Sequence, residues 1–280
     1  MPTARFEQPE SLAAVTALLS AGGWALLAGG TDFYPSQVGR AIDAQLIDIT
    51  RVPQLRGIRQ DEQGWWFGAT TTWTDVLRAE MPPLFDALKA VAREVGGVQI
   101  QNTGTLAGNL CNASPAADGT PVWMALDAQV LLQSRDAERR IAVADFVLGN
   151  RRTARAADEL VVGIHVPRRS ERARSVFLKL GGRRYLVISI SMVAVMVDVD
   201  EAGVVTSAGA AVGSCSARAQ RLPALERKLL GSPVHGLPSI PITAADLAPL
   251  SPIDDVRATA AYRIDATATL LRRALEALQP

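Results

Sequence analysis

Apolar residues recur along the first part of the chain with both helical and strand-like patterns. Residues 9–22 place their leucines and Val15 on one helical face, and residues 83–95 repeat that period up to a pair of glycines. Thr72 and Asp75 have the spacing of a capping box, which predicts a third helix start. Short apolar runs bounded by turn residues predict strands at 24–27, 45–49, 64–69, 128–133 and 159–167.

The pattern changes after a polar, basic segment at 168–174, which we interpret as a solvated linker or a partner-docking patch. Beyond it, alternating apolar runs predict antiparallel strands, and two helical patterns follow them. These elements are expected at 176–180, 187–199, 204–212, 217–230 and 254–278. Strands and helices in segregated runs favour an α+β domain. We therefore expect a first domain at 1–170, with subdomains at about 1–55 and 56–170, and a second at 171–280.

Residues 99–118 are unusually rich in small residues, and Asp118 carries the only charge among them. Gly104, Gly108 and Pro115 interrupt any helical period, so the segment is predicted to be a non-helical loop. Glycine backbones let N–H groups converge on an anion, and the segment adds threonine, asparagine and serine side chains. It is either a cradle for a phosphorylated ligand or a tight pair of turns in a buried core.

A second loop of this kind favours the cradle. Residues 28–32 (Ala-Gly-Gly-Thr-Asp) follow directly on the apolar run 24–27, which predicts a strand that ends in backbone donors, a hydroxyl and an acid. One glycine-rich loop is weak support for a ligand site. Two in a domain of this size indicate that a phosphate-bearing ligand lies between them.

These two loops resemble those of the flavin-carrying medium subunit of the molybdenum hydroxylases, the family of xanthine dehydrogenase and carbon monoxide dehydrogenase. Residues 146–167, 177–184 and 261–275 resemble the same family, and the match runs through nearly the whole chain in order. The resemblance implies an α+β fold. Its first part would be the two-part FAD-binding domain of the vanillyl-alcohol-oxidase (PCMH) type, and its second a smaller domain of the CO-dehydrogenase flavoprotein type.

The resemblance also implies which residues bind FAD. The first phosphate loop would comprise Leu27, Ala28, Gly29, Gly30, Thr31, Asp32 and Phe33. The second would comprise Gly104, Thr105, Gly108, Asn109, Asn112, Ala117 and Asp118, with Asp118 toward the ribose or the ring system. Leu160 and Val161 match a strand that approaches the flavin, and Lys179 is either a cation near it or a surface lysine. The chain departs from the family pattern at Gln101, Ala107 and Val187, where relatives often have Arg, Gly and Asp.

Composition narrows the remaining classes of function. With 29 basic and 28 acidic side chains the net charge is +1, which implies no nucleic-acid-binding surface. The two cysteines cannot supply the four ligands of an iron–sulfur cluster, and two isolated histidines make a zinc site improbable. No apolar run is long enough to span a bilayer and no secretory leader is recognisable, so we expect a cytoplasmic protein.

No nucleophile or acid–base constellation is evident, so we expect no catalytic residue and no metal ligand of the chain's own; a cofactor must carry any chemistry. The family resemblance implies an electron-transfer subunit. A partner with molybdenum cofactor would oxidise the substrate, a small [2Fe–2S] chain would relay electrons, and FAD here would pass them to NAD+ or another acceptor. The alternatives are a self-contained flavin oxidase of the vanillyl-alcohol-oxidase type and a scaffold that has lost its flavin.

Overall fold

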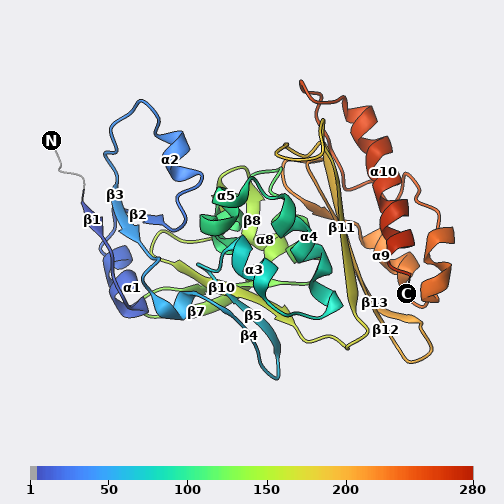
Figure 1. The fold of residues 1–280 in the computed structure, drawn as a ribbon, viewed down its shortest axis with the longest axis horizontal. Helices are drawn as coiled ribbons and strands as arrows, with labels where there is room; N and C mark the ends of the chain where they lie inside the picture. Colours follow the sequence, from blue (N-terminus) through green and yellow to red (C-terminus); the bar gives the residue numbers. More distant parts are fainter. Residues whose placement is uncertain (1–4, 280) are drawn as a thin grey trace.

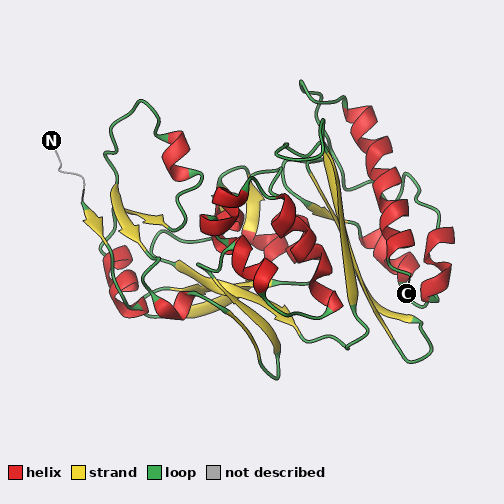
Figure 2. Cartoon of the chain, in the orientation of Figure 1, coloured by secondary structure: helices red, strands yellow, loops and turns green. Residues whose placement is uncertain are grey.

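Three sheets of three or more strands follow one another along the long axis of the molecule in the computed structural model, which describes residues 5–279 (Figure 1). The first is a small parallel sheet, the second a five-stranded antiparallel sheet, and the third a four-stranded antiparallel sheet. Helices lie between the second and third sheets and on the far side of the third (Figure 2). The predicted α+β class is confirmed.

The N-terminal unit contains the parallel sheet, in the order β1-β3-β2. Ser11 begins its helix by accepting a hydrogen bond from the amide of Ala14, and Val15 and Leu19 are buried, as the spacing predicted. Its elements are β1 (Phe6–Glu7), α1 (Leu12–Ser20), β2 (Trp24–Leu27), α2 (Phe33–Ser36) and β3 (Gln45–Asp48). Since Leu27 ends β2, the glycine-rich loop leaves the sheet at its carboxyl edge.

The middle unit is built on the sheet β4-β5-β10-β6-β7. The capping box predicted from Thr72 and Asp75 is present, with both reciprocal hydrogen bonds. Its strands are β4 (Ile58–Gln60), β5 (Gly64–Gly68), β6 (Gln129–Gln133), β7 (Glu138–Ala142) and β10 (Leu160–Pro167), and β8 (Val147–Gly149) pairs with β9 (Arg152–Thr153) apart from them. Its helices are η1 (Pro53–Leu55), α3 (Trp73–Arg78), η2 (Pro83–Phe85), α4 (Asp86–Glu94), α5 (Val98–Thr103), α6 (Leu106–Asn112), α7 (Gly119–Ala125) and α8 (Val143–Phe146).

The prediction that residues 99–118 contain no helix is wrong. The segment contains most of α5 and all of α6. Gly104 lies between them and is the C-cap residue of α5. Thr105 begins α6 because its hydroxyl accepts a hydrogen bond from the amide of Gly108, and Ala113 ends it in the left-handed region at φ 48°. The glycines thus lie at the ends of short helices or within one: Gly97 and Gly104 flank α5, which has no side-chain cap, and Gly108 lies in α6, which Thr105 caps.

The C-terminal unit is a sheet in the order β11-β12-β13-β14, covered on one face by helices of its own. Its elements are β11 (Arg174–Leu180), β12 (Ser191–Val199), β13 (Val205–Gly213), β14 (Gln220–Arg221), α9 (Pro223–Leu229), η3 (Val234–Ser239) and α10 (Ala260–Ala277). The strand and the two helices expected from residues 187, 217 and 254 begin later, at Ser191, Pro223 and Ala260. Pro223 is the first helical residue, where its missing N–H costs nothing.

Strand β12 is apolar at nearly every position because both of its faces are buried. Met192, Ala194 and Met196 pack toward the middle unit, where α7 contacts β12 and β13, and Val193 and Val195 pack toward α9 and α10. A sheet inserted between two helical layers reads as a continuous hydrophobic run. The large shared core holds the C-terminal sheet against α4 and α7, and α7 in turn packs on α6, which belongs to the second glycine-rich segment. Within residues 5–279 no helix is long and apolar enough to cross a membrane.

Candidate functional site

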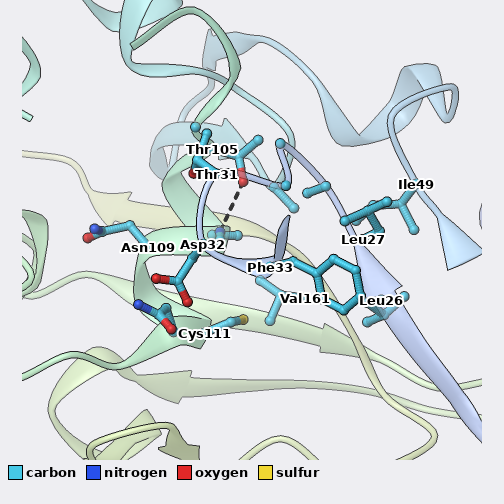
Figure 3. Close-up of a pocket in the computed structure, with 18 of the residues that line it drawn as sticks. Leu26, Leu27, Thr31, Asp32, Phe33, Ile49, Thr105, Asn109, Cys111 and Val161 are labelled. Atoms are coloured by element: carbon cyan, nitrogen blue, oxygen red, sulfur yellow. Dashed lines mark hydrogen bonds between the residues drawn. The ribbon is translucent and has the colours of Figure 1, made fainter. Parts of the chain in front are cut away.

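A cavity of about 470 Å³ lies where the N-terminal unit meets the middle unit (Figure 3). One wall is the loop from β2 to α2, and the other is formed by α6 and the first residues of β10. Both glycine-rich segments thus border a single cavity although about 75 residues separate them in sequence. The lining includes Leu27, Ala28, Gly29, Gly30, Thr31, Asp32, Phe33, Gly104, Thr105, Gly108, Asn109, Asn112, Leu160 and Val161.

The first wall presents unused backbone donors. Among the described residues, the amides of Gly29, Gly30, Thr31 and Asp32 have no hydrogen-bond acceptor, whereas the carbonyls of Gly30 and Asp32 accept from the first turn of α2. Gly30 adopts φ +67°, and a Cβ there would lie 2.5 Å from the ring of Tyr34. Successive amides around a left-handed residue form an anion-binding concavity. The loop can therefore bind a phosphate-bearing group through its backbone.

The two walls touch at Gly29. A Cβ on Gly29 would lie 1.8 Å from the carbonyl oxygen of Thr103, so only glycine allows this approach. The contact fixes the distance between the donor loop and the start of α6. The glycine predicted as a phosphate ligand therefore also sets the width of the cavity.

The second wall uses its amides differently from the sequence-based expectation. The amide of Gly108 donates to the Thr105 hydroxyl at 3.1 Å and that of Asn109 to the Thr105 carbonyl, so both are engaged within α6. The side chains of Asn109 and Asn112 line this wall and make no hydrogen bond among the described residues, and the Oδ1 of Asn109 is buried beside Gly119. Amide side chains that line a cavity without partners fit a ligand that bears both hydrogen-bond donors and acceptors.

One end of the cavity is apolar. In Figure 3, Phe33, Leu26 and Val161 gather at this end, whereas Thr31 lies near Thr105. Burial raises the pKa of the Cys111 thiol to about 11, so this lining residue stays neutral at physiological pH. An elongated ligand with a flat apolar part and an anionic part fits such a division.

The charged lining residues include two arginines that no sequence motif predicted. Arg151 follows β8 and donates to the carboxylate of Asp32 at 3.3 Å, and Arg155 donates to the backbone carbonyl of Glu159 at 2.6 Å. Both lie in residues 151–157 (Arg-Arg-Thr-Ala-Arg-Ala-Ala), a stretch that matches no ligand-binding motif. Only the fold, which brings this stretch opposite residue 32, distinguishes them from surface arginines.

Three of the predicted site residues lie outside this lining: Ala117, Asp118 and Lys179. Lys179 donates to Asp118 at 2.7 Å, and Ser189 donates to the other carboxylate oxygen at 2.7 Å. Glu94 lies 3.8 Å from the same ammonium group, and burial raises the pKa of its carboxyl. This buried network links the middle unit to β11, and contact of its members with FAD stays a prediction.

The strand that carries Leu160 and Val161 is anchored by an ion pair. Arg139 on β7 donates two hydrogen bonds to Glu159, at 2.6 and 2.8 Å, and the amide of Ala156 donates a third at 2.7 Å. The hydrogen bonds from Arg139 hold the pKa of Glu159 below its ordinary value of 4.5. Because the folded pKa is lowered, the stabilisation is present above pH 4.5 and is lost as pH falls through the folded value.

We therefore expect Glu159→Gln to lower the free energy of unfolding by about 1–2 kcal/mol at pH 7, a figure discounted for the half-exposed Arg139. The difference from the unaltered chain should shrink as pH is lowered below 4.5. Thermal unfolding of both proteins at pH 3 to 7 measures this. The matched control is Glu138→Gln. Glu138 is exposed, precedes Arg139 in sequence, and its variant should behave like the unaltered chain. A difference independent of pH would contradict the role of the charge.

These features define a class of protein with a ligand cavity between two subdomains, one with a parallel and one with an antiparallel sheet, and a separate helix-covered sheet. Residues 2–169 match the family described as the FAD binding domain in molybdopterin dehydrogenase, and residues 177–278 match the CO dehydrogenase flavoprotein C-terminal domain. The chain belongs to this family of FAD-binding dehydrogenase subunits. The predicted family, the FAD cofactor and the oxidoreductase class are thereby confirmed.

Individual relatives agree with this assignment. The chain is 34% identical over 219 residues to the nicotinate dehydrogenase FAD-subunit of Eubacterium barkeri, covering 75% of this chain and 73% of the relative. It is 29% identical to the 6-hydroxypseudooxynicotine dehydrogenase complex subunit alpha of Paenarthrobacter nicotinovorans, covering 89% and 85%. A solved structure of carbon monoxide dehydrogenase from Hydrogenophaga pseudoflava that lacks the Mo-pyranopterin moiety superposes with a TM-score of 0.86 at 27% identity, covering 99% and 98%.

Proposed function

We propose that this chain is the FAD-carrying, electron-transferring medium subunit of a multisubunit molybdenum hydroxylase. In this role it receives electrons from a [2Fe–2S] partner, which is itself reduced by a molybdenum-cofactor subunit, and delivers them to NAD+ or another acceptor. Two relatives that match most of this chain, one named as an FAD-subunit and the other as a medium subunit, support the assignment. A cytoplasmic location is part of the proposal.

The single observation that carries the cofactor assignment is the cluster of unused amides at Gly29–Asp32, facing a cavity that the second glycine-rich segment closes. A diphosphate bears two negative charges, and backbone donors bind it without adding a mobile side chain. Gly30 keeps the loop in the required conformation, and the unpaired amide side chains of Asn109 and Asn112 line the opposite wall. Both features fit the dinucleotide part of FAD.

The apolar end of the cavity would shield a flat ring system from water, through Leu26, Phe33 and Val161. When bound, FAD supplies a group that can take up and release one or two electrons. The chain's own residues bind and orient it, and none of those at the cavity offers an acid–base pair for an organic substrate. The division of labour between subunits follows, because substrate oxidation then requires another polypeptide.

The isolated chain should bind one FAD, and a chemical reductant should bleach the absorbance of that flavin. The chain alone should turn over no aromatic heterocycle, aldehyde or carbon monoxide. Anaerobic mixing with a panel of such compounds, followed by flavin absorbance, tests this. If NAD+ is the acceptor, NADH alone should bleach the flavin. Rapid bleaching by an organic substrate without partners would overturn the proposal and favour a self-contained flavin oxidase. A chain that binds no FAD would indicate a scaffold.

A further inference from the structure

Arg151 is placed where a ligand's anionic part would reach it. It occupies the turn between β8 and β9, with φ +56°, and belongs to the middle unit. Its guanidinium nevertheless lies 3.3 Å from Asp32 in the donor loop of the N-terminal unit, 119 positions away in sequence. Asp32 and Arg151 both line the cavity. The pair therefore links the donor loop to the turn between β8 and β9 at the edge of the cavity.

The two cavity arginines differ in how many of their donors are engaged. Arg155 directs Nη1 to the carbonyls of Ala156 and Glu159, which holds its side chain to the backbone. For Arg151 the described residues provide one acceptor, the Asp32 carboxylate at Nη2. A guanidinium has five N–H donors in a planar fork, so Arg151 retains most of its capacity for a ligand.

The sign of the charges favours an anion at this place. Asp32 contributes one negative charge to the lining, beside amides that are suited to phosphate, and taken alone it would repel such a group. Arg151 and Arg155 together reverse the balance to one net positive charge among these three residues. An ion pair as exposed as this one, at 61% and 53%, contributes little to folding, so stability does not explain its position.

We propose that Arg151 binds the diphosphate of the cofactor directly and that Asp32 is the positioning residue that directs its guanidinium toward the cavity. The assignment rests on the proposed function, since it takes FAD as the ligand. Asp32 accepts at one edge of the guanidinium plane, which orients the remaining donors. Arginine binds phosphate oxygens through two parallel hydrogen bonds, so its orientation determines how well it binds.

The test compares FAD affinity in Arg151→Met and Arg152→Met, measured by quenching of flavin fluorescence with the full-length chain. Arg152 is the neighbouring exposed arginine and does not line the cavity, which makes it the matched control. Loss of a charge-assisted contact should raise the dissociation constant of Arg151→Met by about 10- to 100-fold, with Arg152→Met unchanged. The affinity of the unaltered chain should also fall more steeply with salt than that of Arg151→Met. Equal affinities in the two variants would overturn the proposal.

Asp32→Asn separates the positioning role from simple charge. If Asp32 orients Arg151, the variant should bind FAD about two- to fivefold more weakly. If the carboxylate merely repels the phosphates, the variant should bind more tightly, and the positioning role is then refuted. Thermal unfolding of the FAD-free variants should match that of the unaltered chain, which excludes a folding defect as the cause. Failure of the unaltered chain to bind FAD would refute the proposed function itself, an outcome distinct from equal affinities of the variants.

Discussion

A chain in which alanine replaces Gly29 is expected to fold but to retain almost no flavin. The added Cβ would lie 1.8 Å from the carbonyl oxygen of Thr103, and atoms of this kind do not approach within 3.0 Å. The two walls of the cavity must therefore separate by more than about 1 Å, a misplacement that costs about 100-fold in rate at catalytic sites, and we take the same order for binding between two walls. We expect the FAD dissociation constant to rise by at least that factor.

The same substitution should cost only about 1–3 kcal/mol of folding stability, because overpacking at one contact is the sole change. Gly182→Ala is the matched control: a Cβ there meets no atom within 4 Å, and its φ is not in the left-handed region. Flavin content after reconstitution, from the ratio of visible to ultraviolet absorbance, measures the effect. Full flavin content in Gly29→Ala would show that the wall contact does not shape the site.

The location of this contact could be predicted only in part from the sequence. Residues 28–32 follow an apolar run that ends at Leu27. A strand followed by Gly-Gly predicts a turn at that place. The second segment was selected for its small residues, and both segments do line one cavity. The glycines in the sequence predict that each loop can adopt unusual backbone conformations. The distance between the two loops depends on how the N-terminal and middle units pack, and it could not be predicted.

The helices α5 and α6 show where local rules were insufficient. Glycine lowers helix propensity by about 1 kcal/mol, which argued against a helix through Gly104 and Gly108. The Thr105 cap, worth about as much, and the burial of Leu106 and Leu110 outweigh that cost. For α6, the cost of the glycine and the gain from the cap nearly cancel, so the burial of its leucines determines that the helix forms.

Long-range ion pairs could not be predicted at all. Arg151 reaches Asp32 across 119 positions, and Lys179 reaches Asp118 across 61. Single charged residues in a strand or turn are usually solvated, so nothing local marks them as paired. Both pairs join units of the fold, and their partners are known only once the sheets are placed. The resemblance drew attention to Asp118 and Lys179 individually, without the bond between them.

The second large effect concerns this buried pair. The side chains of Lys179 and Asp118 are only 6% and 9% exposed, and Ser189 and Glu94 complete the surroundings. Lys179→Met would leave the Asp118 carboxylate buried without its counter-charge, close to a second acid whose pKa burial already raises. Removing one partner of a buried pair costs about 3–5 kcal/mol. We expect a corresponding fall in the free energy of unfolding of the FAD-free chain, seen in urea or as about 10 °C in Tm.

A double substitution identifies the cause of this loss. Asp118→Asn combined with Lys179→Met removes both charges and keeps an acceptor for the Ser189 hydroxyl, so it should recover at least half of the lost stability. Lys89→Met, at a partly exposed position on α4, controls for loss of a lysine as such and should change stability by less than about 0.5 kcal/mol. If the double variant were as unstable as Lys179→Met alone, packing of the lysine stem would be responsible. The pair would then contribute nothing through its charges to the junction between the middle unit and β11.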